Sequence, residues 1–461
     1  MEGSYDLSNI SAPLIKTKLP GPKSLEYLNI QQELETKAIT YPKQFHIAIR
    51  KAKGSTIEDM DGNIFIDWFG GICVLNLGHA NPIVLNAMKK QMEELTHINE
   101  VPTEARINFL KSMNHSSPGK LKDHSKILTT TTGADACEAA IKIARAVTKR
   151  RTIVAFGGAY HGISGGVVEA TANYHYRSIS GVSYGNFYHL PFPYKYRFPL
   201  KIKEEEISHL LGDQLEYLIR DPYAGPGPIA GVLLEPIQGE GGYIIPPDDF
   251  IPIIKEITEK YSIPLIADEI QSGVGRTGKI WAVENYNVTP DIMCVSKSIG
   301  GGIPLSAVVY NKDYDNAMEP GFHVGTYRGN PLGLAAGSAI LDYLRTSDVL
   351  DKVKRDGAYL LKRFEELQED SNILGEARGK GFMIATEMVT DKISKEPATE
   401  ITKLMKAEMF QRGLLMHSCG HYSNVLRFMA PLTIERELID KGLQIYSEAL
   451  QETKIKSGAL N

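Results

Sequence analysis

Five short apolar runs in the middle of the chain alternate with stretches of helical periodicity, and this alternation is the feature that most limits the fold. The apolar runs span residues 152–156, 231–236, 264–269, 291–296 and 305–311. The helical patterns around them span residues 135–150, 247–261 and 330–347. Strands that are apolar throughout are typical of parallel sheets covered by helices on both faces. We therefore predict an α/β domain built on a mostly parallel sheet.

The rest of the chain predicts a second, smaller α+β domain. From about residue 348 onward the sequence changes to longer amphipathic helical patterns, with one short strand pattern, GFMIATEMV, between them. A chain of 461 residues is long enough for two domains. We predict three parts: an N-terminal arm that belongs partly to the small domain (1–70), a large domain (71–335) and a C-terminal small domain (336–461).

Charge and cysteine content exclude several classes of function. The net charge of -4 gives no basic surface for nucleic acid or for a membrane. No apolar run approaches the length of a membrane span. The four cysteines are widely spaced and form no CxxC pair, so neither a zinc site nor a disulfide framework is indicated. We expect a soluble cytoplasmic protein with reduced thiols and no metal, nucleic-acid or membrane partner.

Charged side chains follow several of the apolar runs at the point where each run ends. Glu235, Asp268 and Lys297 occupy such positions, and Glu269 follows directly after Asp268. In open α/β sheets, ligands bind outside the carboxyl ends of the strands. A buried ammonium group is costly unless it is paired, neutralised or covalently used. Lys297 is therefore either a surface lysine at a strand end or a lysine with a chemical role.

The segment TTTTGADACEAAIKIARAV opens a helical pattern with small residues. Gly133 and Ala134 lie at the turn into the helix, where small side chains let backbone N–H groups approach an anion. Thr131, Thr132 and Asp135 can cap the helix. A phosphate-binding turn and an ordinary capped helix are both consistent with this segment, which matches neither the Walker P-loop nor the GxGxxG fingerprint.

Two further segments carry an aromatic ring and a buried carboxylate. In AFGGAYHGISGG, Tyr160 can stack on a flat cofactor or pack on the core, and His161 can be structural or catalytic. Asp268 needs a cationic or hydrogen-bonding partner, which a protonated ring nitrogen or a helix N-terminus would supply. A lysine that holds an aldehyde, a carboxylate beside a pyridine nitrogen and a helix that holds a phosphate fit together in pyridoxal-phosphate chemistry.

These segments resemble the class III (subgroup II) aminotransferases of PLP fold type I, in the 4-aminobutyrate and ornithine aminotransferase group. The resemblance extends from about Gly54 to Glu448. Its most specific part is ADEIQSGVGRTG followed by WAVE and PDIMCVSKSIGGGIPLSAVV, and LLEPIQGEGGYIIPP, GTYRGNPL and NVLRFMAPLTIE match further family blocks. It implies the fold-type-I architecture, pyridoxal 5'-phosphate (PLP) as cofactor, and amino transfer between an amino acid and a 2-oxo acid.

The resemblance implies a role for each cofactor-binding residue. Lys297 is the Schiff-base lysine and then the general base, and Asp268 pairs with the pyridine nitrogen. Gln271 hydrogen-bonds near the phenolic oxygen of the ring, and Tyr160 stacks on the ring, with His161 in the same loop. The residues implied to contact the phosphate are Gly133, Ala134 and Thr326. Thr326 reaches the phosphate of the neighbouring subunit, so a homodimer or a higher homo-oligomer is implied.

The resemblance also implies how substrates are held, and here the chain departs from its family. Arg427 receives a substrate carboxylate as a bidentate pair, and Glu240 pairs with Arg427 when no carboxylate is present. Ile163 follows YHG where relatives usually carry an arginine for a distal carboxylate, and Ile72 stands where ornithine aminotransferases tend to have tyrosine. Losing a charge-assisted hydrogen bond at Ile163 costs roughly 1.5–3 kcal/mol. Both changes make the pocket more apolar and favour substrates with neutral side chains.

Two other functions are compatible with this type of chain. The same scaffold hosts PLP-dependent amino-acid racemases and 2-epimerases, which reprotonate the substrate from the opposite face instead of transferring its amino group. The motifs do not separate the two outcomes, and family frequency favours transamination. A binding protein that has lost catalysis is the third reading, against which the intact set of Lys297, Asp268 and Gln271 argues.

Overall fold

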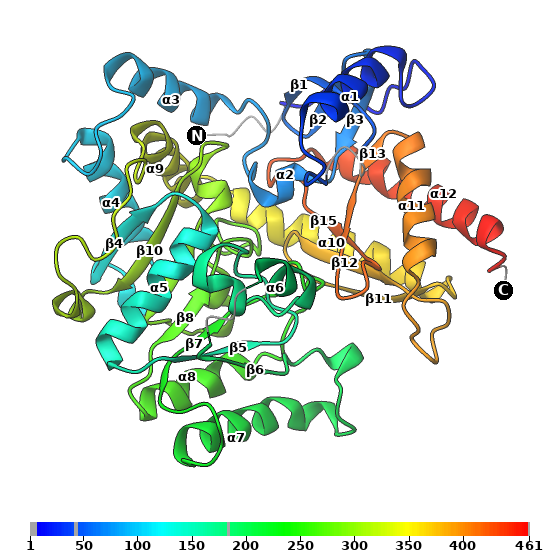
Figure 1. Cartoon of the computed structure of the whole chain (residues 1–461). Helices are drawn as coiled ribbons and strands as arrows, with labels where there is room; N and C mark the ends of the chain where they lie inside the picture. Colours follow the sequence, from blue (N-terminus) through cyan, green and yellow to red (C-terminus); the bar gives the residue numbers. More distant parts are fainter. Residues whose placement is uncertain (1–6, 41–44, 182–184, 460–461) are drawn as a thin grey trace. The chain divides into compact units, whose positions relative to one another are not determined.

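The computed structural model describes residues 7–40, 45–181 and 185–459, which form two compact units. One unit is Ile83–Leu350, and the other combines the described residues of Met1–Pro82 and Asp351–Asn461. Each unit has its own sheet or sheets (Figure 1). Among the described helices, none is long and apolar enough to cross a membrane.

A seven-stranded sheet forms the centre of the unit Ile83–Leu350. Its strands are β4 (Ser125–Thr130), β5 (Thr152–Phe156), β6 (Phe187–Leu190), β7 (Ile229–Leu234), β8 (Leu265–Asp268), β9 (Ile292–Val295) and β10 (Ser306–Asn311). The order across the sheet is β4-β10-β9-β8-β7-β5-β6. Neighbouring pairs from β6 to β9 are parallel, whereas β10 is antiparallel to both β9 and β4. The predicted, mostly parallel sheet is therefore confirmed, with one antiparallel strand in it.

Successive residues of a strand point to opposite sides of the sheet. Because the central strands are apolar throughout, both faces of this sheet are apolar. The helices of the unit are α3 (Pro82–Glu94), α4 (Glu104–Ser116), α5 (Gly133–Thr148), α6 (Tyr174–Ser180), α7 (Ile207–Arg220), α8 (Phe250–Lys260) and α9 (Pro331–Thr346). Buried residues of α7 and α8 cluster with Val154 and Leu234, and those of α5 cluster with Ile153 and Leu233. Each such side chain contributes about 1.5–3 kcal/mol through burial, so polar groups are left to the strand ends.

The second unit contains two smaller sheets. The first has the order β1 (Ile49–Lys53), β2 (Thr56–Asp59), β3 (Ile64–Asp67), β13 (Leu414–Leu415). The second has the order β11 (Leu374–Lys380), β12 (Met383–Met388), β15 (Val425–Phe428), β14 (His417–Cys419). The helices are α1 (Pro22–Leu34), α2 (Gly70–Cys73), α10 (Val349–Glu369), α11 (Thr399–Gln411) and α12 (Arg436–Ser457). Because β3 pairs in parallel with β13, residues near the two ends of the chain share one sheet.

The units divide at other residues than the three predicted parts. The predicted boundary at 335/336 lies inside α9, and this helix packs on α4 within the unit Ile83–Leu350. The predicted boundary at 70/71 lies within α2, whereas the unit that contains α2 extends to Pro82. The change to amphipathic patterns at about residue 348 lies closer to the observed division between Leu350 and Asp351 than the predicted boundary at 335/336 does.

Candidate active site

The carboxyl ends of five strands meet at one edge of the seven-stranded sheet. β5, β7, β8 and β9 are parallel, and β4 runs in the same direction because β10 is antiparallel to both β4 and β9. The residues that follow these strands at this edge include Gly133, Tyr160, Glu235, Asp268 and Lys297. The structure therefore brings the strand-end residues singled out in the sequence to one edge, which is where ligands bind in α/β sheets.

Asp268 ends β8 and is almost completely buried. Its Oδ2 accepts hydrogen bonds from His161 Nδ1 (2.7 Å) and from Cys137 Sγ (3.4 Å). Its Oδ1 accepts one from the backbone N–H of Ile270 (3.0 Å). One ligand atom each from Cys137, His161 and Asp268 lies within 4.8 Å of the others, a spacing that also suits a metal ion. The hydrogen bonds described above already account for the contacts of Asp268. A carboxylate oxygen has two lone pairs, so Oδ1 can accept one further hydrogen bond.

Glu235 follows β7 and is a second buried carboxylate near this edge. Its two oxygens accept hydrogen bonds from the backbone N–H groups of Tyr160 (3.0 Å) and Gly239 (2.8 Å). Burial raises the pKa of Glu235 to about 7; nearby His161 opposes this rise in pKa, whereas Asp268 adds to it. A Cβ atom on Gly239 would lie 2.7 Å from Cδ of Gln271, so a larger residue at this position would displace the Gln271 side chain. The loop after β7 is thus held against the turn that carries Gln271.

Lys297 follows β9 and has a backbone φ of 49°, in the left-handed region that residues other than glycine rarely adopt. It is half-buried at the start of a short 3-10 helix, Lys297–Gly300. Such a conformation costs of order 1–3 kcal/mol and is concentrated at functional sites. Ile72, another predicted site residue, has a φ of 58° in the other unit. The backbone at Lys297 therefore carries a conformational cost that an ordinary surface lysine does not need.

The first turn of α5 has two free N–H groups. Thr132 is the N-cap and accepts a hydrogen bond from the Asp135 N–H (3.2 Å). The N–H groups of Gly133 and Ala134 have no hydrogen-bond partner among the described residues. A Cβ atom on Gly133 would lie 3.0 Å from Cδ1 of Ile270. Small residues, two free N–H groups and a helix N-terminus together fit an anion such as a phosphate.

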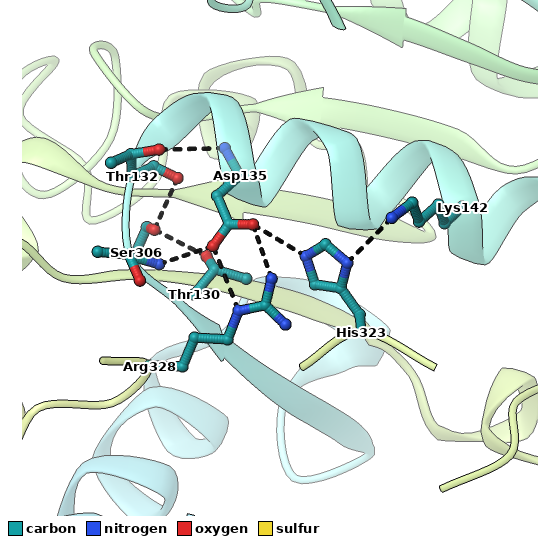
Figure 2. Close-up of polar contacts among 8 residues, drawn as sticks. Thr130, Thr132, Asp135, Lys142, Ser306, His323 and Arg328 are labelled. Carbon is teal, nitrogen blue, oxygen red and sulfur yellow. Dashed lines mark hydrogen bonds and ion pairs between the residues drawn. The ribbon is translucent and has the colours of Figure 1, made fainter. Parts of the chain in front are cut away.

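Asp135, in this first turn, is bound on both sides by cationic and polar groups (Figure 2). Its Oδ1 contacts Arg328 Nη2 (2.8 Å) and His323 Nε2 (3.0 Å), and its Oδ2 contacts Arg328 Nε (3.4 Å) and the Thr131 N–H (3.0 Å). Lys142 Nζ, on the same helix, lies 3.4 Å from His323 Nδ1. Burial alone would raise the pKa of Asp135, but the hydrogen bonds from His323, Thr131 and Arg328 hold that pKa well below its usual range.

Thr326 lies in an exposed turn, and the residue that follows this turn is anchored to the rest of the unit. Thr326 itself is exposed, as are the apolar side chains of Val324 (67%) and Tyr327 (69%). The next residue, Arg328, is buried and forms the ion pair with Asp135. The structure thus connects the turn that carries Thr326 to the first turn of α5.

The loop after β5 holds the remaining predicted residues of this unit. Tyr160 is half-buried and its ring packs edge-to-face on that of Tyr176, with centroids 5.8 Å apart. His161 is buried, and its Nε2 has no hydrogen-bond partner among the described residues. Ile163 is 51% exposed, which is unusual for isoleucine. An apolar side chain is therefore presented at the surface of this loop.

Of the predicted substrate-binding residues Arg427, Ile72 and Glu240, the first two belong to the other unit. Arg427 lies in β15, is completely buried, and pairs in the ladder with Ala385 and His417. Ile72 lies in α2 and is half-buried. Glu240 is half-buried in the loop after β7 of the unit Ile83–Leu350.

Sequence reasoning missed several polar residues of this region. From the sequence, Cys137 is only one of four widely spaced cysteines, whereas in the structure its thiol contacts Asp268 from α5. Its position in α5, four residues after Gly133 and on the buried face, was the available signal. His323 and Arg328 were not singled out, because no local pattern relates them to Asp135, which lies 188 and 193 residues earlier.

Comparison with known proteins gives one family. The family model Aminotransferase class-III matches residues 39–450. The 4-aminobutyrate aminotransferase of Escherichia coli (strain K12) is 36% identical over 408 residues, which cover 88% of this chain and 93% of that protein. The alanine/serine racemase of Pyrococcus horikoshii is 32% identical over 458 residues, which cover 98% of this chain and 95% of that protein.

Solved structures of transaminases have the same fold. A thermostable (S)-enantioselective omega-transaminase from Thermomicrobium roseum matches with a TM-score of 0.84 and 29% identity, covering 93% of this chain and 98% of that chain. The taurine:2-oxoglutarate aminotransferase from Bifidobacterium kashiwanohense, solved in complex with PLP and glutamate, matches with a TM-score of 0.86 and 26% identity, covering 96% of this chain and 99% of that chain.

Proposed function

Because this chain belongs to the class III aminotransferases, we propose that it transfers amino groups to and from amino acids with neutral side chains. The enzyme is a PLP-dependent aminotransferase that moves an amino group between an amino acid and a 2-oxo acid. The family match across residues 39–450, together with the strand-end residues at one sheet edge, is the observation that carries this conclusion.

The residues at the sheet edge fit the cofactor. The two free N–H groups of Gly133 and Ala134 suit the phosphate, and the open lone pair on Asp268 Oδ1 suits a ring N–H. When bound, PLP withdraws electrons from the α-carbon of the amino acid. In this proposal Asp268 keeps the ring nitrogen protonated, and His161 keeps the Asp268 carboxylate oriented. Lys297 binds the cofactor and then moves the proton at the α-carbon.

Further residues of the proposed site hold the ring and the substrate. Gln271 hydrogen-bonds near the phenolic oxygen, and Tyr160 stacks on the ring. Arg427 binds the substrate carboxylate as a bidentate pair, which planar guanidinium groups do well. Glu240 neutralises Arg427 when no carboxylate is present.

Substrate preference rests on Ile163 and Ile72. In the proposed pocket, an apolar side chain at Ile163 offers no partner to a distal carboxylate, and desolvating an unpaired carboxylate is unfavourable. An aliphatic substrate side chain gains about 25 cal/mol per Å² of apolar surface buried. Leucine, isoleucine, methionine or alanine should therefore be better amino donors than 4-aminobutyrate or glutamate.

The experiment compares the wild type with Ile163→Arg on both groups of donors. We expect kcat/KM of the wild type to favour the neutral amino acids, and Ile163→Arg to shift the preference toward distal carboxylates. Ile163→Leu is the matched control, because it keeps the side chain apolar. A wild type that prefers 4-aminobutyrate would refute the apolar pocket and would point to another cation, such as Lys195 or Arg197.

The proposed assembly is a homodimer in which Thr326 contacts the phosphate of the neighbouring subunit. The exposed apolar side chains beside Thr326, Val324 and Tyr327, support it, because exposed apolar residues that gather in one place mark interaction surfaces. A cytoplasmic location is also part of the proposal. All four cysteines are buried and none forms a disulfide, as expected in a reducing compartment.

Amino-acid racemisation is the second candidate function. The observation that favours it is the match to an alanine/serine racemase over 98% of this chain. Both reactions remove the same proton, so Lys297 and Asp268 would keep their proposed roles. The two reactions differ in where the amino group ends, which a labelling experiment resolves.

A further inference from the structure

The buried ion pair between Asp135 and Arg328 joins two segments that the proposed function uses separately. Asp135 lies in the first turn of α5, beside the free N–H groups of Gly133 and Ala134. Arg328 follows directly on the exposed turn that carries Thr326. We propose that this pair has two separate effects: it positions the Thr326 turn for association with a second copy of the chain, and it neutralises the Asp135 carboxylate beside the proposed phosphate site. This inference rests on the proposed homodimer.

Among the described residues, the hydrogen bonds of the Arg328 guanidinium group all go to Asp135. Two guanidinium nitrogens bind the two carboxylate oxygens of Asp135, at 2.8 and 3.4 Å (Figure 2). The third nitrogen, Nη1, is buried without a hydrogen-bond partner among the described residues. The side chain of Arg328 is only 6% exposed. Burial of this charge is therefore compensated by Asp135, and the geometry of the pair sets where the chain passes into the Thr326 turn.

His323 fixes the other end of the same segment. Its Nε2 lies 3.0 Å from Asp135 Oδ1, and its Nδ1 lies 3.4 Å from Lys142 Nζ. A lysine ammonium group only donates, so in this arrangement Nδ1 accepts and Nε2–H donates. The imidazole thus links two turns of α5 to the segment before Thr326.

The backbone after Thr326 is held independently by Arg106. Its Nη2 donates to the carbonyl oxygens of Arg328 (3.2 Å) and Gly329 (3.3 Å). Gly329 has a φ of 64°, and a Cβ atom there would lie 2.5 Å from Arg106 Nη2. The turn is therefore anchored at its base from two sides, while its tip at Val324–Tyr327 is exposed.

The charge of Asp135 gives the ion pair a second effect. A carboxylate in the first turn of a helix stabilises that helix, but it also repels an anion at the same N-terminus. Arg328 neutralises this carboxylate at the proposed phosphate site. Loss of Arg328 should therefore weaken phosphate binding through charge and weaken association through the position of the turn.

The test uses Arg328→Gln, Asp135→Asn and the double variant Asp135→Asn/Arg328→Gln, each as the full chain. PLP dissociation constants are measured by titrating the cofactor-free protein, and association is measured by sedimentation velocity with and without PLP. Lys126→Gln is the matched control, because it removes one cation from an exposed ion pair with Asp315 in the same unit. Circular dichroism confirms that each variant is folded.

We expect Arg328→Gln to raise the PLP dissociation constant on the order of tenfold and to weaken association. The double variant should recover most of the PLP affinity, since the unpaired carboxylate is gone, but it should remain weakly associated. Arg328→Lys should recover PLP affinity for the same electrostatic reason if Arg328→Gln proves unstable. Lys126→Gln should change neither quantity.

Three results would overturn the inference. They are unchanged PLP affinity and association in Arg328→Gln, equal loss of PLP affinity in the single and double variants, and a wild type that stays monomeric with PLP bound. None of these measurements needs turnover. A wild type that binds PLP and associates but transfers no amino group would instead contradict the proposed function alone.

Discussion

His161 Nδ1 lies 2.7 Å from Oδ2 of Asp268, and both side chains are buried although they are 107 residues apart in the sequence. The contact joins the loop after β5 to the end of β8. A hydrogen bond between two buried side chains restricts the orientation of both. His161 therefore fixes the direction in which the Asp268 carboxylate presents its second oxygen.

Asp268→Asn should keep part of the bound PLP but lose most of the rate. A neutral amide cannot hold the ring nitrogen protonated, so the cofactor withdraws electrons less well. We expect the rate to fall about a hundredfold, which corresponds to an activation barrier raised by about 3 kcal/mol. Single-turnover kinetics with excess PLP measure this loss. Turnover within a few-fold of the wild type would show that Asp268 is not the partner of the ring.

Lys297→Ala should abolish activity and the visible absorbance of the covalently bound cofactor, because we assign the covalent attachment to this amine alone. Reduction with borohydride followed by peptide mass spectrometry measures the linkage. The wild type should carry the label on Lys297. Label at another lysine, or a reducible linkage that persists in the variant, would refute this assignment.

Arg427→Ala should weaken the binding of every substrate with an α-carboxylate. Truncating one partner of a buried charge pair costs about 2–5 kcal/mol, so KM should rise at least tenfold for all amino acids. A primary amine without a carboxylate is the matched control substrate, and its KM should change little. Equal changes for both substrates would mean that Arg427 has a structural role.

Glu235 makes the stability of the cofactor-free protein depend on pH. Burial raises its pKa from 4.5 to about 7 in the folded chain. Between these values the folded chain binds the proton more tightly than the unfolded chain, so stability falls as pH rises through this window. The loss is at most about 3 kcal/mol. Glu235→Gln should show a shallower fall in urea unfolding experiments, and identical pH slopes would contradict the raised pKa.

The central strands could be predicted because they are apolar on both faces. The runs at 152–156 and 291–296 became β5 and β9 within a residue at each end, since burial on both sides leaves little room for other structure. β4 (Ser125–Thr130) was not predicted, because its exposed and half-buried residues give it no continuous apolar run. The antiparallel direction of β10 was also missed, since a strand pattern carries no direction.

A residue of the candidate site could be predicted where a sequence motif contains it. It could not be predicted where only a tertiary contact brings it to the site. Asp268 and Lys297 end apolar strands, so their position at the sheet edge follows from the fold. The thiol of Cys137 and the side chain of Arg328 acquire their contacts from packing between segments more than a hundred residues apart. No periodicity or spacing in the sequence reports such contacts.

The most direct test of the account follows the amino nitrogen. The purified enzyme with PLP is incubated with nitrogen-15-labelled L-leucine and 2-oxoglutarate or pyruvate, and the products are analysed by mass spectrometry and chiral chromatography. We predict that the label moves to glutamate or alanine while leucine becomes its 2-oxo acid in equal amount. Conversion of leucine to its D-enantiomer, with the label retained and no 2-oxo acid formed, would contradict the account and identify a racemase.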